Sequence, residues 1–180
     1  MHSGSATAIT RLAYGSPARK LMSAPVLAPA RPAGRAAHFI DVENLCGSSD
    51  VRTYEAQTVM RRYHDAVQIA DGDHVIVAAS HHNAFAAGWS WPGARLLMPC
   101  SGPDGADRMI RDALRQENIA ARFAVVFLGS GDGGFAADLA GLAAEGARTH
   151  VVSRASSLSR ALRLAAHAVT TLPPRIGGRP

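Results

Sequence analysis

The sequence is poor in the residues that mark several specialised protein classes. Two cysteines among 180 residues are too few for a disulfide-dense scaffold or a cysteine-based zinc ribbon. No apolar run approaches about 18 residues, the length that marks a membrane-spanning helix, so we expect no membrane partner. Aromatic residues make up only 6% of the chain, so the core must be built mainly from aliphatic residues and alanine. Few, reduced cysteines are typical of cytosolic proteins, and we expect a cytoplasmic location.

Acidic residues are absent from the first 36 residues, which contain five arginines and lysines. The rest of the chain carries 14 basic and 14 acidic residues, so the net charge of +5 arises entirely from this segment. Four prolines and the lack of apolar periodicity predict a disordered tail over residues 1–36, and a shorter tail is expected over 174–180. A basic tail without acids is suited to electrostatic contact with RNA phosphates.

Short apolar runs alternate with helical patterns between residues 37 and 173. Each run is apolar throughout, as expected of a parallel strand that is buried on both faces. Apolar side chains at helical spacing lie between the runs, for example from Ala106 to Leu114. This alternation predicts a single three-layer α/β/α domain with a mostly parallel central sheet. The predicted strands span 37–40, 74–80, 94–98, 124–129, 149–153 and, more weakly, 168–172.

Aspartates follow three of the predicted strands. Asp41 ends the first, Asp107 lies where a helix begins after the third, and Asp132 follows the fourth. Ligands of open parallel sheets bind beyond the carboxyl ends of the strands, so the three side chains are expected at one edge. Crowded carboxylates repel one another, and a bound Mg²⁺ or Mn²⁺ would relieve that repulsion. The sequence therefore predicts a divalent metal site formed by these aspartates.

The same acids have a simpler explanation, because aspartate is a favoured helix N-cap. Asp132 could cap the helix that it opens, and Asp104 or Asp107 could cap the preceding one. Asp41 is harder to explain in this way, since it ends an apolar strand. Asp138, further along its helix, is expected to be a surface charge.

Three segments carry a family resemblance when taken in order: FIDVENL, GPDGADRMIRDAL and VVFLGSGDGGFAADLAGLAAEGARTHVVS. Together they resemble the NYN domain of the PIN-like nuclease superfamily, and the match covers about residues 37–172. The resemblance implies a compact α/β/α fold and a Mg²⁺- or Mn²⁺-dependent ribonuclease whose partner is RNA. It leaves the oligomeric state open, and a homo-oligomer is possible.

The resemblance also assigns roles to single residues. Asp41, Asp107 and Asp132 match the acids that bind metal, and a metal-activated water would then hydrolyse the phosphodiester. Asn44 matches an asparagine that helps to position metal or phosphate. Ser130 matches the small hydroxyl residue before the last acid, where it would contact the substrate.

One position departs from the family pattern. Many members read SGD-x-D-F, whereas this chain reads SGDGGF, with Gly134 at the place of the second acid. Glu43 could supply the missing charge, and an acid introduced at position 134 is expected to tighten metal binding. The departure also favours an alternative function, a catalytically weak or inactive RNA-binding module with the same fold.

A second alternative is a dinucleotide-binding protein of the Rossmann type. The segment GSGDGG over 129–134 fits the pattern G-x-G-x-x-G between a strand and a helix. Two features argue against it. Asp132 would repel the pyrophosphate, and the motif follows the fourth predicted strand rather than the first.

Other side chains could contact the substrate. His81 and His82 follow the second predicted strand at the same edge of the sheet and could bind phosphate. Four arginines could follow a phosphate backbone, although an arginine on a helix is usually solvated: Arg108, Arg111, Arg115 and Arg122. Trp89 and Trp91 could stack on bases or form a hydrophobic lid. His38, within the first strand, is expected to be a core residue.

Overall fold

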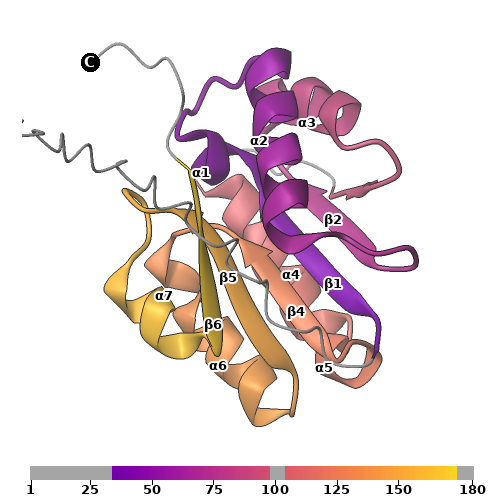
Figure 1. The fold of residues 1–180 in the computed structure, drawn as a ribbon, viewed down its shortest axis with the longest axis vertical. Helices are drawn as coiled ribbons and strands as arrows, with labels where there is room; N and C mark the ends of the chain where they lie inside the picture. The colour runs from indigo at the N-terminus through magenta and orange to yellow at the C-terminus, as the bar shows by residue number, and fades with distance from the viewer. Residues whose placement is uncertain (1–33, 98–103, 174–180) are drawn as a thin grey trace, which may run out of the picture.

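Six parallel strands form one sheet in the order β3-β2-β1-β4-β5-β6 (Figure 1). The computed structural model describes residues 34–97 and 104–173, and most of both predicted tails therefore lies outside the described residues. The sheet and its flanking helices confirm the predicted three-layer α/β/α architecture. The strands are β1 (Ala36–Asp41), β2 (His74–Ala78), β3 (Arg95–Leu96), β4 (Val125–Gly129), β5 (Arg148–Arg154) and β6 (Ala168–Leu172).

All six predicted runs contribute strands, but their lengths differ from the prediction. The third is reduced to two residues, which pair only with β2 at one edge of the sheet. The first begins at Ala36, which pairs with Val125 of β4. At the other edge β6 spans the predicted residues, and both ends of β1, β4 and β5 lie within one residue of the prediction.

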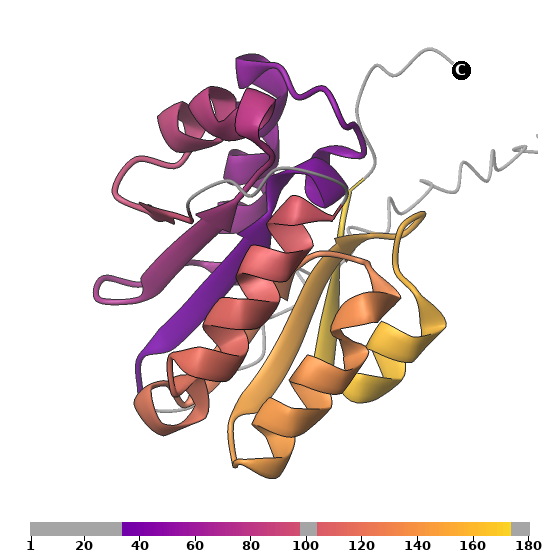
Figure 2. The same cartoon turned by 180° about the vertical axis from the view of Figure 1, so that it is seen from behind.

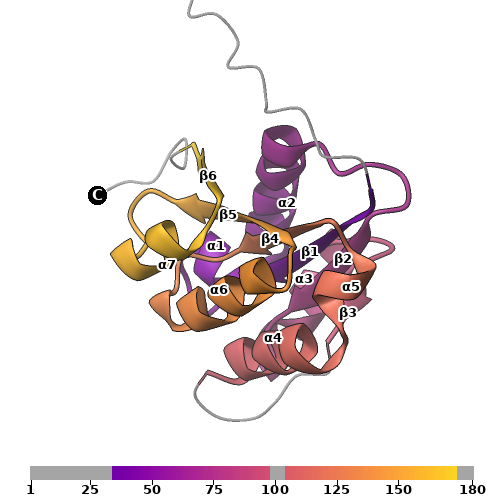
Figure 3. The same cartoon turned by 90° about the horizontal axis from the view of Figure 1, so that it is seen from below.

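Helices cover both faces of the sheet (Figures 2 and 3). Alternate residues of β1 belong to the two hydrophobic cores: Phe39 packs with α4 and α6, whereas Ile40 packs with α2. Among the described residues, no helix is both long and apolar enough to cross a bilayer. The helices are α1 (Val42–Cys46), α2 (Thr53–Val67), η1 (His81–Asn83), α3 (Ala84–Ser90), α4 (Gly105–Gln116), α5 (Ile119–Arg122), η2 (Gly133–Phe135), α6 (Ala136–Ala144) and α7 (Arg160–Ala165).

The chain reverses its direction of travel across the sheet between β1 and β4. From β1 it proceeds outward to β2 and β3, and it then returns through α4 to place β4 on the other side of β1. Connections leave the ends of β1 and β4 toward opposite faces at such a switch point, and this divergence opens a crevice that binds ligands in doubly wound sheets. Asp41 ends β1, and Asp132 lies three residues beyond the end of β4.

The buried His38 confirms the prediction of a core histidine. It is fully buried in β1, and its ring stacks on Phe127 with ring centroids 4.5 Å apart. Nδ1 lies 3.1 Å from the Tyr63 hydroxyl and Nε2 lies 3.3 Å from a carboxylate oxygen of Asp73. Both ring nitrogens are therefore satisfied within the fold, as buried polar atoms require.

Candidate active site

Asp41 is the most deeply buried acid at the switch point, with 4% of its surface exposed. One carboxylate oxygen accepts a hydrogen bond from the backbone amide of Asn44 at 3.0 Å, so that Asp41 caps α1. The other oxygen accepts a hydrogen bond from the Ser130 hydroxyl at 3.1 Å. Burial raises the pKa of Asp41 to about 6, although both hydrogen bonds act in the opposite direction. The nearby charges of Glu43 and Asp132 raise this pKa further.

Asp107 lies in the first turn of α4 and is partly buried beside the other two aspartates. Burial raises the pKa of Asp107 to about 7, and the charge of Asp41 adds to the increase. When protonated, Asp107 can donate a hydrogen bond to Asp132, which favours the protonated form. The three aspartates that follow predicted strands are therefore neighbours, and they interact electrostatically.

Asp132 both caps a helix and belongs to the cluster of three aspartates. Asp132 accepts a hydrogen bond from the Gly134 amide at 2.9 Å and so caps η2, while its charge still reaches Asp41 and Asp107. Asp104 occupies the N-cap position of α4, but its side chain makes no capping hydrogen bond. The cap thus sets the direction of the Asp132 carboxylate without removing it from the site.

Asn44 and Ser130 join the end of β1 to the loop after β4. The Asn44 side-chain oxygen accepts a hydrogen bond from the Gly131 amide at 2.9 Å. Ser130 is fully buried, with its hydroxyl donated to Asp41. No surface of this side chain is accessible in the structure, and the predicted substrate contact of Ser130 stays a prediction. Ser130 positions the Asp41 carboxylate.

Glu43 is committed to a different set of hydrogen bonds. Its Oε1 atom accepts from the Ser80 amide at 2.8 Å, from the Ser80 hydroxyl and from the Asn83 side-chain amide at 2.6 Å. Asn83 is buried and also accepts from the Val51 amide at 2.9 Å. This network connects α1 with η1, and it occupies the Oε1 atom of Glu43 with structural hydrogen bonds. The charge of Glu43 nevertheless contributes to the raised pKa of Asp41.

The histidines and tryptophans proposed as substrate contacts divide into exposed and buried residues. His81 and His82 are exposed in η1, and His82 Nε2 lies 2.7 Å from the Ser49 carbonyl oxygen. Trp89 is 67% exposed, so it is accessible to a base. Trp91 is buried against Tyr63, which fits the hydrophobic packing that the sequence also allows and leaves its ring inaccessible to a base.

Arg111 is one of four arginines that the sequence offers as phosphate contacts, and the structure places it beside Gly134. A Cβ atom at Gly134 would collide with Arg111 Nη2, so the guanidinium occupies the space of the missing acid. Its charge opposes the rise in the pKa of Asp107. Arg111 follows Asp107 by four residues and so shares its helix face, but the sequence does not single it out from the other arginines. Arg108 is an exposed residue of the same helix.

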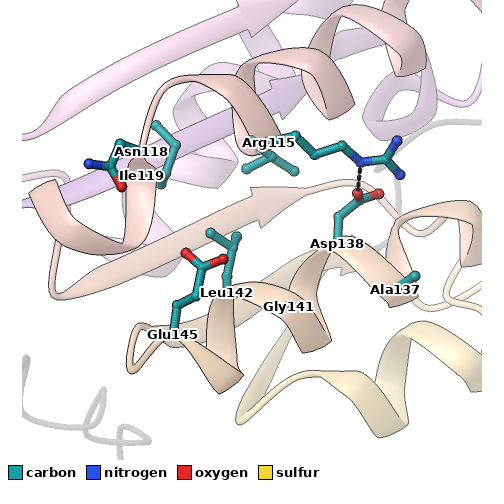
Figure 4. Close-up of a pocket in the computed structure, with 9 residues that line it drawn as sticks. Arg115, Asn118, Ile119, Ala137, Asp138, Gly141, Leu142 and Glu145 are labelled. Carbon is teal, nitrogen blue, oxygen red and sulfur yellow. Dashed lines mark hydrogen bonds and ion pairs between the residues drawn. The ribbon is translucent and has the colours of Figure 1, made fainter.

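Asp138 is buried, so the prediction of a surface charge is wrong. Its carboxylate lies between α6 and α4, where it accepts a hydrogen bond from Arg115 Nε at 2.6 Å (Figure 4). The other oxygen lies 3.8 Å from Arg111 Nε. Two arginines of α4 therefore compensate the charge of this aspartate, which explains why it can be buried.

A groove of about 360 Å³ lies between α6 and the C-terminal part of α4 with the start of α5 (Figure 4). Leu114, Ile119 and Leu142 line it, together with the Arg115–Asp138 pair. Its lining includes none of Asp41, Asp107 and Asp132, so the groove is separate from these three aspartates.

The predicted metal site has the expected oxygen donors, but its side chains are not arranged as a complete coordination shell. Within residues 34–97 and 104–173, no three or more His, Cys, Asp or Glu side chains are grouped so that they could hold a metal ion. The aspartate carboxylates are nevertheless the hard oxygen donors that Mg²⁺ and Mn²⁺ prefer. Burial is the main cause of the raised pKa values of Asp41 and Asp107, and the charges of neighbouring acids add to it. A bound cation would favour the charged form of both carboxyls.

No family model and no curated protein matches the sequence. Among solved structures, the chain is similar to VPA0982 of Vibrio parahaemolyticus RIMD 2210633, a protein of unknown function, at 19% sequence identity. The match covers 78% of this chain and 93% of that chain, with a TM-score of 0.49. A similarity of this size carries no information about function.

Proposed function

We propose that the chain is a divalent-metal-dependent ribonuclease that hydrolyses phosphodiester bonds at the edge of the sheet between β1 and β4. The observation that carries the proposal is the meeting of Asp41, Asp107 and Asp132 from three different elements, two of them with raised pKa values. Carboxyls with raised pKa values that gather at a switch point are candidates for a functional site, because ligands of open parallel sheets bind there.

The three aspartates would hold Mg²⁺ or Mn²⁺, since their donor type suits a hard cation. A bound divalent ion supplies charge compensation for the phosphodiester and lowers the pKa of its water. Repulsion between the carboxylates in the protein without metal fits this role, because it gives the site an affinity for positive charge.

The protein's own residues prepare the site in distinct ways. Hydrogen bonds from the Asn44 amide and the Ser130 hydroxyl fix both oxygens of Asp41, so its carboxylate enters the reaction already oriented. The pKa of Asp107 in the protein without metal is about 7, so binding of a cation near neutral pH would displace a proton from this carboxyl. The backbone amide of Gly134 orients Asp132 by donating a hydrogen bond to its carboxylate.

RNA is the proposed substrate because of the family resemblance and the basic N-terminal segment, which carries the net charge of +5. A dinucleotide is a weaker candidate. The glycine-rich loop follows β4 and presents Asp132 beside Asp41 and Asp107, so a pyrophosphate would approach a negatively charged surface.

A second candidate function is an RNA-binding module with little or no activity. It is favoured by the combination of Gly134 in place of an acid, the Arg111 guanidinium in the space beside it, and the lack of a metal-ready cluster in the described residues. In that case the carboxylate edge would bind RNA without cleaving it.

A cleavage assay on a mixed RNA pool separates the two candidates. Wild-type protein is incubated with Mg²⁺, with Mn²⁺ or with EDTA, and Asp41→Asn serves as the matched variant. The ribonuclease proposal expects cleavage that requires metal and Asp41, with 5′-phosphate and 3′-hydroxyl ends because water is the nucleophile. Cleavage that persists in EDTA, or 2′,3′-cyclic phosphate ends, would contradict it. RNA binding without cleavage would support the module.

A further inference from the structure

Arg111 places a positive charge directly beside the carboxylates. It lies one helical turn after Asp107 on α4, and Gly134 leaves room for its guanidinium. Arg111 Cζ lies 3.2 Å and an Asp132 carboxylate oxygen lies 3.5 Å from the point where a Gly134 Cβ would be. The guanidinium and the Asp132 carboxylate therefore flank the same small volume.

The contacts of Arg111 hold the guanidinium in place and use few of its donors. Its Cζ lies 5.3 Å from the centre of the Phe135 ring, which supports one face of the group. Nε is buried and makes no hydrogen bond to the described residues, and its distance of 3.8 Å to Asp138 is an ion pair only. Asp138 itself is bonded more closely to Arg115, at 2.6 Å. With 31% of its side chain exposed, Arg111 can be reached by a ligand.

A phosphodiester that approaches Asp41, Asp107 and Asp132 is repelled unless positive charge meets it. The guanidinium is planar and can donate two parallel hydrogen bonds to phosphate oxygens. We infer that Arg111, whose guanidinium lies where a second acid would otherwise be, binds a phosphate group of the RNA next to the aspartates. The inference rests on the proposed ribonuclease or RNA-binding function, and it identifies the group that receives the phosphate.

The competing explanation is that Arg111 serves only to neutralise the buried Asp138. Arg115 provides a matched control, because it lies on the same helix, carries the same charge and makes the shorter bond to Asp138. A purely structural role predicts that loss of Arg115 is at least as harmful as loss of Arg111. A phosphate-binding role predicts the opposite order for RNA affinity.

The test measures RNA binding in EDTA, so that it does not depend on cleavage. Fluorescence anisotropy follows a labelled single-stranded oligouridylate with wild type, Arg111→Gln, Arg111→Lys and Arg115→Gln over a range of salt concentrations. Melting temperatures of all four proteins identify any loss of folding.

We expect Arg111→Gln to weaken binding about tenfold and to reduce the salt slope by about 0.7, the value for one phosphate contact with a single strand. Arg111→Lys retains the charge without the planar fork, so it should keep the salt slope but lose part of the affinity. Arg115→Gln should change the affinity by less than about twofold, because the glutamine amide can still donate a hydrogen bond to Asp138 and Arg111 keeps its place beside Gly134.

Equal affinities for Arg111→Gln and Arg115→Gln would overturn the inference, and so would a wild type that does not bind the oligouridylate. Failure of the ribonuclease proposal has a different signature. In that case the wild type leaves RNA intact with Mg²⁺ and Mn²⁺, while the dependence of binding on Arg111 persists.

Discussion

Neutralising Asp41 should make the metal-free protein more stable at alkaline pH. Asp41→Asn removes a buried negative charge but keeps the size and shape of the side chain. Its amide oxygen can still accept from the Asn44 amide, and the Ser130 hydroxyl can rotate to accept from the new NH₂ group. The substitution therefore tests the electrostatics of the site with little change in packing.

The magnitude follows from the pKa of Asp41, which burial raises from 3.8 to about 6. Each pKa unit corresponds to about 1.4 kcal/mol, so the charged carboxylate costs about 3 kcal/mol of folding free energy above pH 7. The pKa of about 6 already includes the hydrogen bonds that stabilise the charged form, so nothing further is subtracted for them. The expected gain is therefore about 3 kcal/mol, or a rise in Tm of about 6–12 °C for a chain of this size.

The pH dependence has a definite sign. The folded protein binds the Asp41 proton more tightly than the unfolded chain does, so wild-type stability falls as the pH rises from about 4 through about 6. Near pH 4 and below, the proton is present in both states, and the advantage of Asp41→Asn should disappear.

The assay is urea or thermal unfolding in EDTA at pH 8 and near pH 4. Ser130→Ala is the matched control, because it removes a hydrogen bond that stabilises the Asp41 carboxylate and should lower the stability at pH 8. If Asp41→Asn is less stable than wild type at pH 8, the carboxylate is stabilised rather than strained, and the reasoning about a repulsive cluster fails.

Three further predictions concern activity and binding. Asp107→Asn and Asp132→Asn should each abolish metal-dependent cleavage without lowering the Tm in EDTA, and full activity in either variant would remove that residue from the site. From the sequence alone, an acid at position 134 is expected to tighten metal binding, but the structure places the Arg111 guanidinium there, so Gly134→Asp should instead form an ion pair with Arg111. It should therefore weaken oligouridylate binding several-fold without improving Mg²⁺ affinity in a calorimetric titration, and tighter Mg²⁺ binding would contradict this. Deleting residues 1–33 removes four basic residues and should reduce the salt slope of RNA binding by up to about 2.8, at about 0.7 per phosphate. An unchanged slope would exclude the segment from RNA contact.

The central strands could be predicted from sequence because a parallel strand buried on both faces has a simple pattern. The same is true of Asp41 and Asp132, since strand ends in an open parallel sheet converge on one edge. Asp107 required only that the helix of the third connection begin at the same edge. Local pattern and a general rule of topology were sufficient for this part of the site.

Side chains that depend on how two helices meet could not be predicted in this way. The burial of Asp138 and the placement of Arg111 depend on the contact of α4 with α6, and no pattern within either helix encodes it. Likewise, Trp91 lies just after α3, and only the packing of that segment against Tyr63 makes it buried rather than exposed. The hydrogen bonds of Glu43 depend on the distance between α1 and η1 in the folded domain.

The hydrogen bonds across the switch point have a kinetic consequence. Ser130 and Asp41 are separated by 89 residues, and Gly131 and Asn44 by 87. Long chain closures of this kind slow folding, because their entropy must be lost before the contacts form. The carboxylate cluster therefore cannot assemble until β4 has paired with β1. During refolding, Mg²⁺ binding should appear together with this central pairing and later than the helical circular dichroism signal.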